Sequence, residues 1–368
     1  MKNQASKFKF LLLLAGAVFA FMVHGQAYER SRKVVRSFPV TGQTEIQVSN
    51  KYGNIHIIPW EKDSVRFEIV LLVKANKESK VDRTFEYIDF DFKANEYYVI
   101  AQTVFQGKGG FWSEVTDLAS NLFSSGTTTQ IDYTIHFPGR NELKLENKFG
   151  NIYTTDHTAR IDIDLSNGDL KAHAFRGDSK ISLEFGNADI DEIDRGRILL
   201  KYAELTIEKS DFLNIESRSS RLFITESEDV IIDSRRDRIN IRYLNSIEGE
   251  ASFSYIDIGT LYDKMDLRTR YGELELAELA KDASFISINT EYTDIILPVD
   301  LSMFYDVEIV HNGKTEIILP SSVLTRKESV VNEEEDIRKL EFKAGKLSIN
   351  EKPISIKADA GKINFKEE

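Results

Sequence analysis

Hydrophobic positions along the middle of the chain follow two periods. Within short segments, apolar and polar residues alternate, as in Ile161-Asp162-Ile163-Asp164 and Arg238-Ile239-Asn240-Ile241. A period of two is typical of a β-strand with one buried and one exposed face. The alternating segments themselves recur at a nearly constant step, so the pattern predicts many copies of one strand-containing unit.

A corner separates the two strands of each unit, and its third residue serves as a marker. Glycine is expected there because it admits the positive φ that a sharp bend requires, with Asn or Asp as the next best choice. An isolated earlier copy of the corner stands at Lys51-Tyr52-Gly53-Asn54-Ile55. The other markers, mostly 17 or 18 residues apart, are Gly150, Gly168, Gly186, Ala203, Ser220, Asp237, Ile256, Gly272 and Thr293.

Aliphatic residues dominate three positions of the unit, namely five residues before the marker and two and four residues after it. The first of these columns is Leu145, Ile163, Ile181, Ile198, Ile215, Ile232, Ala251, Leu267 and Ile288. Units this short stack on one another and bury one another's faces. The sequence therefore predicts an all-β fold, a parallel β-helix or solenoid with about 17–18 residues per rung. The crossover rule favours right-handed coiling.

The composition predicts four segments. The first carries three lysines and then an apolar run, which is typical of a secretory signal peptide cleaved before Gln26. The last is expected to hold irregular strands, including Lys346–Ile349 and Lys362–Phe365, and a charged loop from Arg326 to Asp336. The four segments are a signal peptide at 1–25, a β-rich module at 26–135, the solenoid repeats at 136–300 and a C-terminal β cap at 301–368.

An insertion at residues 107–126 interrupts the N-terminal module. Its apolar side chains fall at helical spacing, and glycine and serine residues flank it. It is predicted to form a short amphipathic helix that caps an open end of the stack and hides strand edges. The alternative is a docking site for a partner or a membrane surface. The residues concerned are Phe111, Trp112, Val115, Leu118 and Leu122.

Charge and cysteine content exclude several classes of protein. The formal net charge is −12, and losing the signal peptide would make the chain more acidic, which argues against nucleic-acid binding. Cysteine is absent, so there are no disulfides, thiolate metal sites, cysteine nucleophiles or lipid-bearing cysteines. No later stretch is long and apolar enough to span a membrane. An exported protein of the periplasm or cell surface is expected.

Motifs for catalysis are missing. The sequence contains no HExxH, GxSxG, P-loop or GxGxxG arrangement. The histidines of the mature chain are scattered without metal-ligand spacing, at His56, His136, His157, His173 and His311. We therefore expect no enzyme activity, no catalytic residue, no metal site and no cofactor.

Basic residues form the most unusual surface pattern. Lys201, Arg218 and Arg235 stand two residues before consecutive markers, and Arg221 and Arg238 stand one residue after them, in a column read as Glu204, Arg221, Arg238 and Asp257. Stacking would bring like charges within about 5 Å at the backbone. One interpretation is a salt-bridge ladder with Glu216 and Asp233, which lie on the same face as the first column. The other is a binding site for an anionic glycan.

An aromatic residue precedes many of the markers. Such a column could bind sugar by stacking, but aromatic columns more often pack against their own neighbours, which is the interpretation we favour. The aromatic residues are Phe149, Phe185, Tyr202, Tyr255, Tyr271 and Tyr292.

The corner motifs resemble a known family. Asn50-Lys51-Tyr52-Gly53-Asn54-Ile55, Asn147-Lys148-Phe149-Gly150-Asn151-Ile152 and Ser166-Asn167-Gly168-Asp169-Leu170 are similar to those of the exported bacterial β-strand-repeat adhesin family, of the head-GIN kind. The resemblance covers roughly residues 45 to 300. It implies a β-solenoid of the cell envelope with an adhesin role, and it supplies no catalytic residues. The absence of cysteine departs from the lipoprotein members and leaves the mode of anchoring open.

The sequence therefore predicts a non-enzymatic, exported interaction, adhesin-like or scaffold protein of the bacterial cell envelope. Its partner would be an unknown envelope protein or a glycan. The alternative is a polysaccharide-binding or polysaccharide-cleaving β-helix protein, which rests on fold analogy alone.

Overall fold

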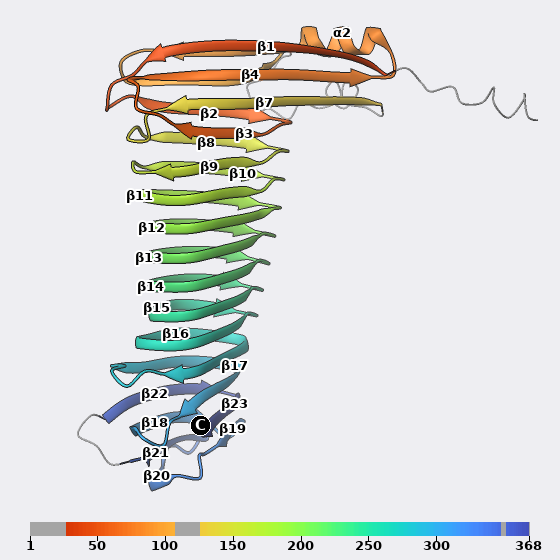
Figure 1. Cartoon of the computed structure of the whole chain (residues 1–368). Coiled ribbons are helices and arrows are strands. Elements are labelled where there is room, and N and C mark those ends of the chain that lie inside the picture. The colour runs from red at the N-terminus through yellow and green to blue at the C-terminus, as the bar shows by residue number, and fades with distance from the viewer. Residues whose placement is uncertain (1–26, 107–125, 347–350, 368) are drawn as a thin grey trace, which may run out of the picture. The chain divides into compact units, whose positions relative to one another are not determined.

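A computed structural model describes residues 27–106, 126–346 and 351–367. These residues form 23 strands, joined in one long sheet, and a single helix, α2 (Glu78–Tyr87) (Figure 1). The expected all-β class is confirmed. The predicted signal peptide lies outside the described residues, as does all but the last residue of the insertion at 107–126, including Phe111, Trp112, Val115, Leu118 and Leu122.

The chain divides into two compact units. The described residues of the smaller unit are 27–33, 70–89, 104–106 and 126–130, and those of the larger unit are 34–69, 90–103, 131–346 and 351–367. In the smaller unit, α2 buries Val81, Thr84 and Phe85. The Arg30 guanidinium lies 4.7 Å from the centre of the Phe85 ring and also donates a 2.9 Å hydrogen bond to Asp82.

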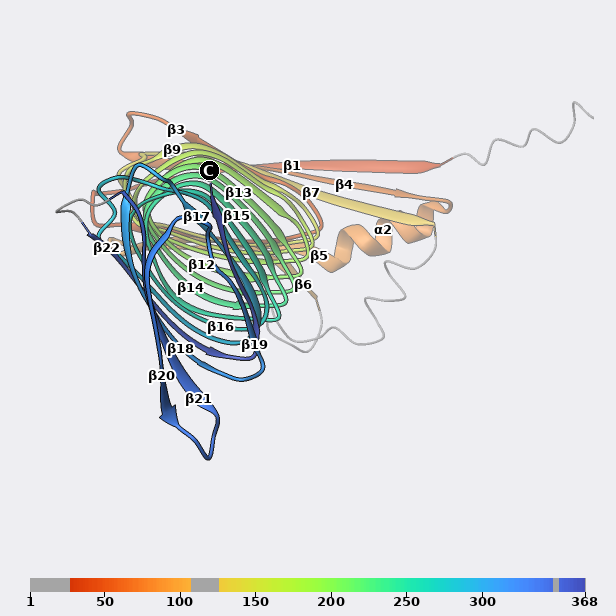
Figure 2. The ribbon, with the colours of Figure 1, turned by 90° about the horizontal axis from the view of Figure 1, so that it is seen from below.

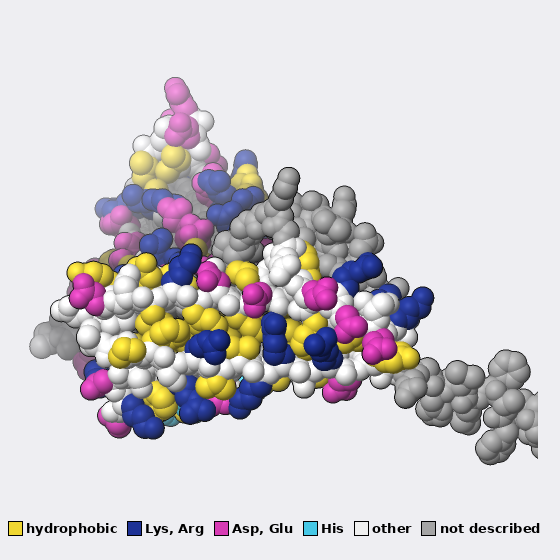
Figure 3. Space-filling view, turned by 90° about the horizontal axis from the view of Figure 1, so that it is seen from above, with side chains coloured by type: hydrophobic (Ala, Val, Ile, Leu, Met, Phe, Trp, Pro, Cys, Tyr) yellow, Lys and Arg dark blue, Asp and Glu magenta, His cyan; other side chains and the backbone are white. Residues whose placement is uncertain are grey.

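The N-terminal strands include one that is exposed along most of its length. This strand, β1 (Tyr28–Pro39), pairs with β4 (Ser64–Ala75) and exposes Arg30, Lys33 and Arg36. Figure 3 shows such dark blue cationic side chains beside a row of yellow hydrophobic ones. Cations along an exposed strand oppose its pairing with another chain. The remaining N-terminal strands are β2 (Glu45–Lys51), β3 (Ile55–Pro59), β5 (Ile88–Ala94), β6 (Tyr98–Phe105) and β7 (Thr127–Phe137).

Parallel pairing between successive repeats builds the centre of the larger unit. Ile163 pairs with Ile181, Ile181 with Ile198, Ile198 with Ile215, and Ile215 with Ile232, so each step is 17 or 18 residues as predicted. Viewed along the stack in Figure 2, the turns from β11 to β16 overlie one another. The strands are β8 (Leu143–Lys148), β9 (Ile152–His157), β10 (Ile161–Ser166), β11 (Leu170–Glu184), β12 (Asn187–Lys201), β13 (Glu204–Arg218), β14 (Arg221–Arg235), β15 (Arg238–Ser252), β16 (Tyr255–Leu279) and β17 (Phe285–Val299).

The stack continues beyond residues 136–300 in both directions. The early corner at Gly53 is not isolated, because β2 and β3 pair in parallel with β8 and β9, with Val48 opposite Leu145 and Ile55 opposite Ile152. At the other end, β22 (Glu351–Asp359) and β23 (Gly361–Glu367) pair in parallel with β17. Lys362–Phe365 is a strand, as predicted, but it belongs to a further regular rung.

The charged loop predicted from Arg326 to Asp336 is mostly a strand. In the structure, β20 (Val323–Asn332) pairs in antiparallel fashion with β21 (Ile337–Gly345), and only residues 333–336 form the turn. This hairpin follows β18 (Phe304–Asn312) and β19 (Thr315–Ile318). The charged residues mark an exposed strand, because period-two alternation is lost when neither face is buried.

The three aliphatic columns point into the core, as predicted. Ile163, Ile181 and Ile198 are fully buried, and every residue named in the first column has an exposed fraction of 3% or less.

One corner was assigned wrongly. Tyr255 lies opposite Arg238, so the marker after Asp237 is Ser254 and not Ile256. Since the error is two residues, it leaves the same residues on the buried face.

The glycines at the corners have a different role from the one predicted. Positive φ occurs at the residue before the marker, including Phe149 (60°), Phe185 (56°) and Tyr202 (52°), and not at Gly150, Gly168, Gly186 or Gly272. A Cβ atom on Gly168 would instead overlap the carbonyl oxygen of Gly150 in the preceding rung. Glycine is needed for the close approach of two backbones.

Candidate binding surface at the corners

Two kinds of corner differ in how their backbone amides are satisfied. In the first kind, the amide after the marker donates to the side chain one rung earlier: Asn151 to Asn54, Asp169 to Asn151 and Asn187 to Asp169, each at 2.9 Å. From Glu204 to Glu273, the same amide donates to the preceding marker's carbonyl oxygen, as in Arg221 to Ala203 at 2.9 Å. The side chains after the marker are then free to face solvent.

Buried marker side chains accept hydrogen bonds at several corners of the second kind. The amide of Ala203 is 3.3 Å from the Ser220 hydroxyl, and that of Ser220 is 2.7 Å from the Asp237 carboxylate. Asp237 also accepts hydrogen bonds from the hydroxyls of Ser217 (2.6 Å) and Ser234 (2.7 Å) and from the Arg235 amide (2.9 Å). With only 3% of its surface exposed, this carboxylate is part of the scaffold of the corner.

The structure brings the predicted basic residues together on this second kind of corner. Lys201 pairs in register with Arg218, and Arg218 with Arg235, while Arg221 pairs with Arg238. Asp257 does not belong to the second column, where Tyr255 takes its place, because Asp257 lies opposite Asn240.

The salt-bridge ladder is only partly formed. Arg218 pairs with Glu216, and Arg221 with Glu204, both at 3.5 Å between mostly exposed side chains. No ion pair joins Asp233 to Arg235 in the described structure, and among the described residues Lys201 and Arg238 have no carboxylate within 4.0 Å. The Arg238 guanidinium instead lies 5.7 Å from the centre of the Tyr255 ring. The cationic surface is therefore incompletely neutralised.

The aromatic column is packed against itself. Phe185 and Tyr202 stack with centroids 5.2 Å apart, Phe253 and Tyr271 at 5.0 Å, and Tyr271 and Tyr292 at 5.1 Å. Within each pair the stacked rings cover one another's facing sides, so the packing interpretation is confirmed for these pairs. Tyr255, which we had placed in this column, belongs to the neighbouring one, and Phe253 takes its position.

A hollow of about 490 Å³ lies beside the aromatic column. Its lining includes Tyr202 and Ser219, small Gly186 and Ala203, and the Glu204–Arg221 pair. Tyr202 is the most exposed ring of the column at 60%. This hollow was not predicted, although Ser219, a small residue in a column with many aromatic rings, marks its position in the sequence.

A second hollow, lined mainly by basic side chains, lies on the strands that precede the corner. It has a volume of about 360 Å³ and is lined by Arg160, Lys180, Arg195, Arg197 and Phe212, among others. Lys180 pairs with Asp162, and Arg195 with Asp178, both at 3.6 Å. Two of its cations are thus already occupied by partners within the chain.

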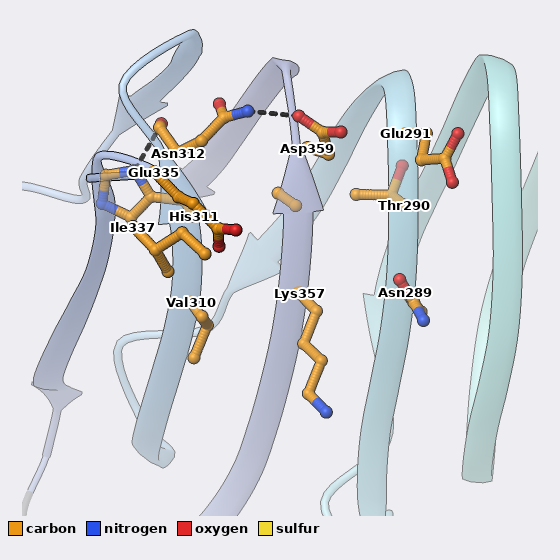
Figure 4. Close-up of a pocket in the computed structure, with 11 residues that line it drawn as sticks. Asn289, Thr290, Glu291, Val310, His311, Asn312, Glu335, Ile337, Lys357 and Asp359 are labelled. Carbon is orange, nitrogen blue, oxygen red and sulfur yellow. Dashed lines mark hydrogen bonds between the residues drawn. The ribbon is translucent and has the colours of Figure 1, made fainter. Parts of the chain in front are cut away.

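A third hollow, of about 390 Å³, lies near the C-terminal strands (Figure 4). The amide of Asn312 donates to Asp359, and the Lys357 side chain extends away from this pair. Glu291, also on the lining, is engaged by Arg270 at 2.8 Å. These side chains do not converge on one point where a reacting atom could sit, so the hollow does not provide an acid–base pair.

The histidines occupy unrelated environments. His157 is buried, and loss of solvation lowers its pKa, although a hydrogen bond with the Arg160 carbonyl opposes this. His173 is exposed, and its hydrogen bond with Asp156 raises its pKa. Within the described ranges, no three His, Asp or Glu side chains cluster as metal ligands. None of the described helical segments is long and apolar enough to cross a membrane.

Comparisons with known proteins give only distant structural similarity. No protein-family model matches the sequence, and no curated protein does. The structure is similar to a putative cell adhesion protein from Clostridium sporogenes (12% identity, 92% of this chain and 100% of the other, TM-score 0.21). It is also similar to a putative adhesin from Bacteroides fragilis (12%, 70% and 97%, 0.32) and a putative lipid binding protein from Parabacteroides distasonis (12%, 70% and 96%, 0.32). At these identities and TM-scores, the similarities carry no argument about function.

Proposed function

We propose that this protein is a non-enzymatic, adhesin-like binding protein of the bacterial cell envelope, built as an exported β-solenoid. Export follows from the predicted signal peptide at residues 1–25, and right-handed coiling stays a prediction. The proposal concerns the corner surface formed by Lys201, Arg218, Arg221, Arg235 and Arg238, together with the aromatic column between them.

One observation carries the proposal. From Ala203 to Ser254, the amide after each marker donates to a backbone carbonyl oxygen of the preceding rung, and the buried Ser220 and Asp237 side chains accept from marker amides. The outward side chains on these rungs are therefore not needed to hold the backbone. They form parallel columns at strand spacing, about 4.8 Å per rung, which suits a repetitive or extended ligand.

Glycoside hydrolysis at the corner hollow is disfavoured because its acids are paired with arginines. Glycoside hydrolysis needs two carboxyl groups about 5–9.5 Å apart across one bond. At the corner hollow, Glu204 is engaged by Arg221, and the nearby Glu216 by Arg218. The polysaccharide-binding alternative is more compatible with the site than the polysaccharide-cleaving one, because incompletely neutralised arginines can bind carboxylates without reacting.

A binding screen with a matched variant tests this function. Purified wild-type protein would be applied to arrays of glycans and to envelope extracts, beside the double variant Arg218→Gln with Arg235→Gln. We expect saturable binding that weakens as salt rises and is lost in the double variant. Equal binding by a folded double variant would show that these columns are only structural.

A further inference from the structure

The corner column has a gap one ring thick. Its order is Phe185, Tyr202, Ser219, Arg236 and Phe253, all at the positive-φ position of successive rungs. Tyr202 stacks on Phe185 with planes 5° apart, and the Arg236 guanidinium lies 5.9 Å from the centre of the Phe253 ring. Both flat groups thus continue the stack toward Ser219, whose side chain has no ring.

The size of the gap matches one inserted ring. Tyr202 and Arg236 are separated by two rungs, roughly 9.6 Å at a strand spacing of ~4.8 Å. A ring placed midway would lie ~4.8 Å from each, within the ~4.5–7 Å range of stacked rings. The gap adjoins the 490 Å³ hollow, whose lining includes Tyr202 and Ser219.

Charge around the gap favours an anionic ring. Lys201 and Arg218 stand on one side of the ring column, Arg221 stands on the other, and Arg236 lies in the column itself. Glu204 and Glu216 offset only Arg221 and Arg218. In the part of the chain that the structure describes, Lys201 and Arg236 have no carboxylate within 4.0 Å.

We propose that Ser219 marks a slot for one residue of an acidic polysaccharide, with the flat face of a hexuronate-type sugar on Tyr202. The sugar carboxylate would meet Lys201, Arg218 or Arg221, and Arg236 would close the other side. This proposal rests on the proposed function and names its ligand class. An aromatic side chain of a protein partner would fit the gap, but it would leave the surrounding cations without an anion.

Filling the slot with a ring tests the proposal. Ser219→Tyr should extend the stack, because φ at Ser219 is 54° and Tyr202 adopts 52°. Asn167→Tyr is a matched control, since Asn167 has φ 57° and lies in the same column between Phe149 and Phe185. Arg236→Gln leaves the slot open but removes its cationic wall. Each variant would be checked for folding by circular dichroism and a urea midpoint.

Calorimetric titration with tetragalacturonate and with its neutral methyl ester provides the readout. Wild type should bind the acid at least ~10-fold more tightly than the ester, as expected for charge-assisted contacts. Ser219→Tyr should weaken binding by more than ~30-fold and Arg236→Gln by about 10-fold, whereas Asn167→Tyr should stay within about twofold.

The outcomes separate this slot from the broader function. Tetragalacturonate binding that is unchanged in folded Ser219→Tyr and Arg236→Gln overturns the slot and leaves a glycan-binding corner. If wild type binds no acidic oligosaccharide but still binds envelope material through the basic columns, the ligand class is wrong and the adhesin-like function stands. A tyrosine-containing peptide that binds in the slot while the sugar does not would assign it to a protein partner. If Ser219→Tyr does not fold, Arg236→Gln decides.

Discussion

The rings of Phe185 and Tyr202 lie 5.2 Å apart with their planes 5° apart, although 17 residues separate them in the sequence. Parallel pairing in register places equivalent positions of successive rungs directly above one another. A residue type repeated at this spacing therefore becomes a column on the surface, whether of rings, cations or hydroxyls.

Removing one ring from the longest stack should weaken the fold measurably. Tyr271 stacks on both Phe253 and Tyr292, so Tyr271→Ala should lower the free energy of unfolding by about 1–2 kcal/mol. Tyr271→Phe keeps both ring contacts and should be nearly neutral. Urea denaturation of the two variants provides the measurement, and an alanine variant as stable as wild type would mean that the exposed stack does not stabilise the corner.

The marker glycines should not tolerate even a methyl group. Gly168→Ala would force Cβ into the carbonyl oxygen of Gly150, a backbone atom that side-chain rotation cannot move away. We expect a loss of about 1–3 kcal/mol or more, as for overpacked sites. Gly42→Ala is the control, because nothing lies within 4 Å of the Cβ position at Gly42. If the two variants have equal thermal midpoints, close backbone approach is not the reason for glycine at this corner.

The buried carboxylate at Asp237 should be essential for stability. Asp237→Ala would leave the Ser217 and Ser234 hydroxyls and the Ser220 amide without their acceptor, which should cost at least ~3 kcal/mol. Asp233→Ala, at an exposed position four residues earlier, should change stability by less than ~0.5 kcal/mol. Chemical denaturation of both variants would contradict the scaffold role of Asp237 if their midpoints were the same.

Stability should fall on acidification partly because of His157. Its pKa is lowered in the folded state by burial, whereas an unfolded histidine takes up a proton near pH ~6.5. Below that pH the unfolded state binds more protons, so folding stability decreases as pH falls toward the folded-state pKa. His157→Phe should keep ring packing against Phe137, whose centroid is 5.6 Å away, and should show a smaller loss. Denaturation midpoints of wild type and His157→Phe at pH 7.5 and 5.5 provide the measurement. If the midpoint falls by the same amount in both proteins, His157 does not contribute to the loss of stability.

The repeat itself was predictable from sequence because burial of one face imposes a period of two and stacking imposes a constant step. The columns through Ile163, Ile181 and Ile198 are buried for this reason. The register failed at Ile256, because that corner is Phe253-Ser254 and lacks a glycine to identify it. Ser254 is recognisable from the strand register, from the positive φ of Phe253 and from its hydrogen bond with the Asp237 amide.

Other features depend on contacts that the linear pattern does not contain. Helix α2 was missed although Val81, Thr84 and Phe85 show helical spacing, because the surrounding charges dominate the segment. The basic residues lie in register as the sequence predicted, except that Tyr255 replaces Asp257 in the second column, and the slot proposed at Ser219 was not predicted. Its walls, Tyr202 and Arg236, are recognised only when the ring stack on either side has been seen.

The most direct test of the account is to incubate the purified protein with an acidic polysaccharide and measure binding and polymer length in the same sample. We expect saturable, salt-sensitive binding with no change in polymer length, and loss of binding in the Arg218→Gln, Arg235→Gln double variant. Shortening of the polymer that persists through purification and disappears with a single substitution, or equal binding by the double variant, would contradict it.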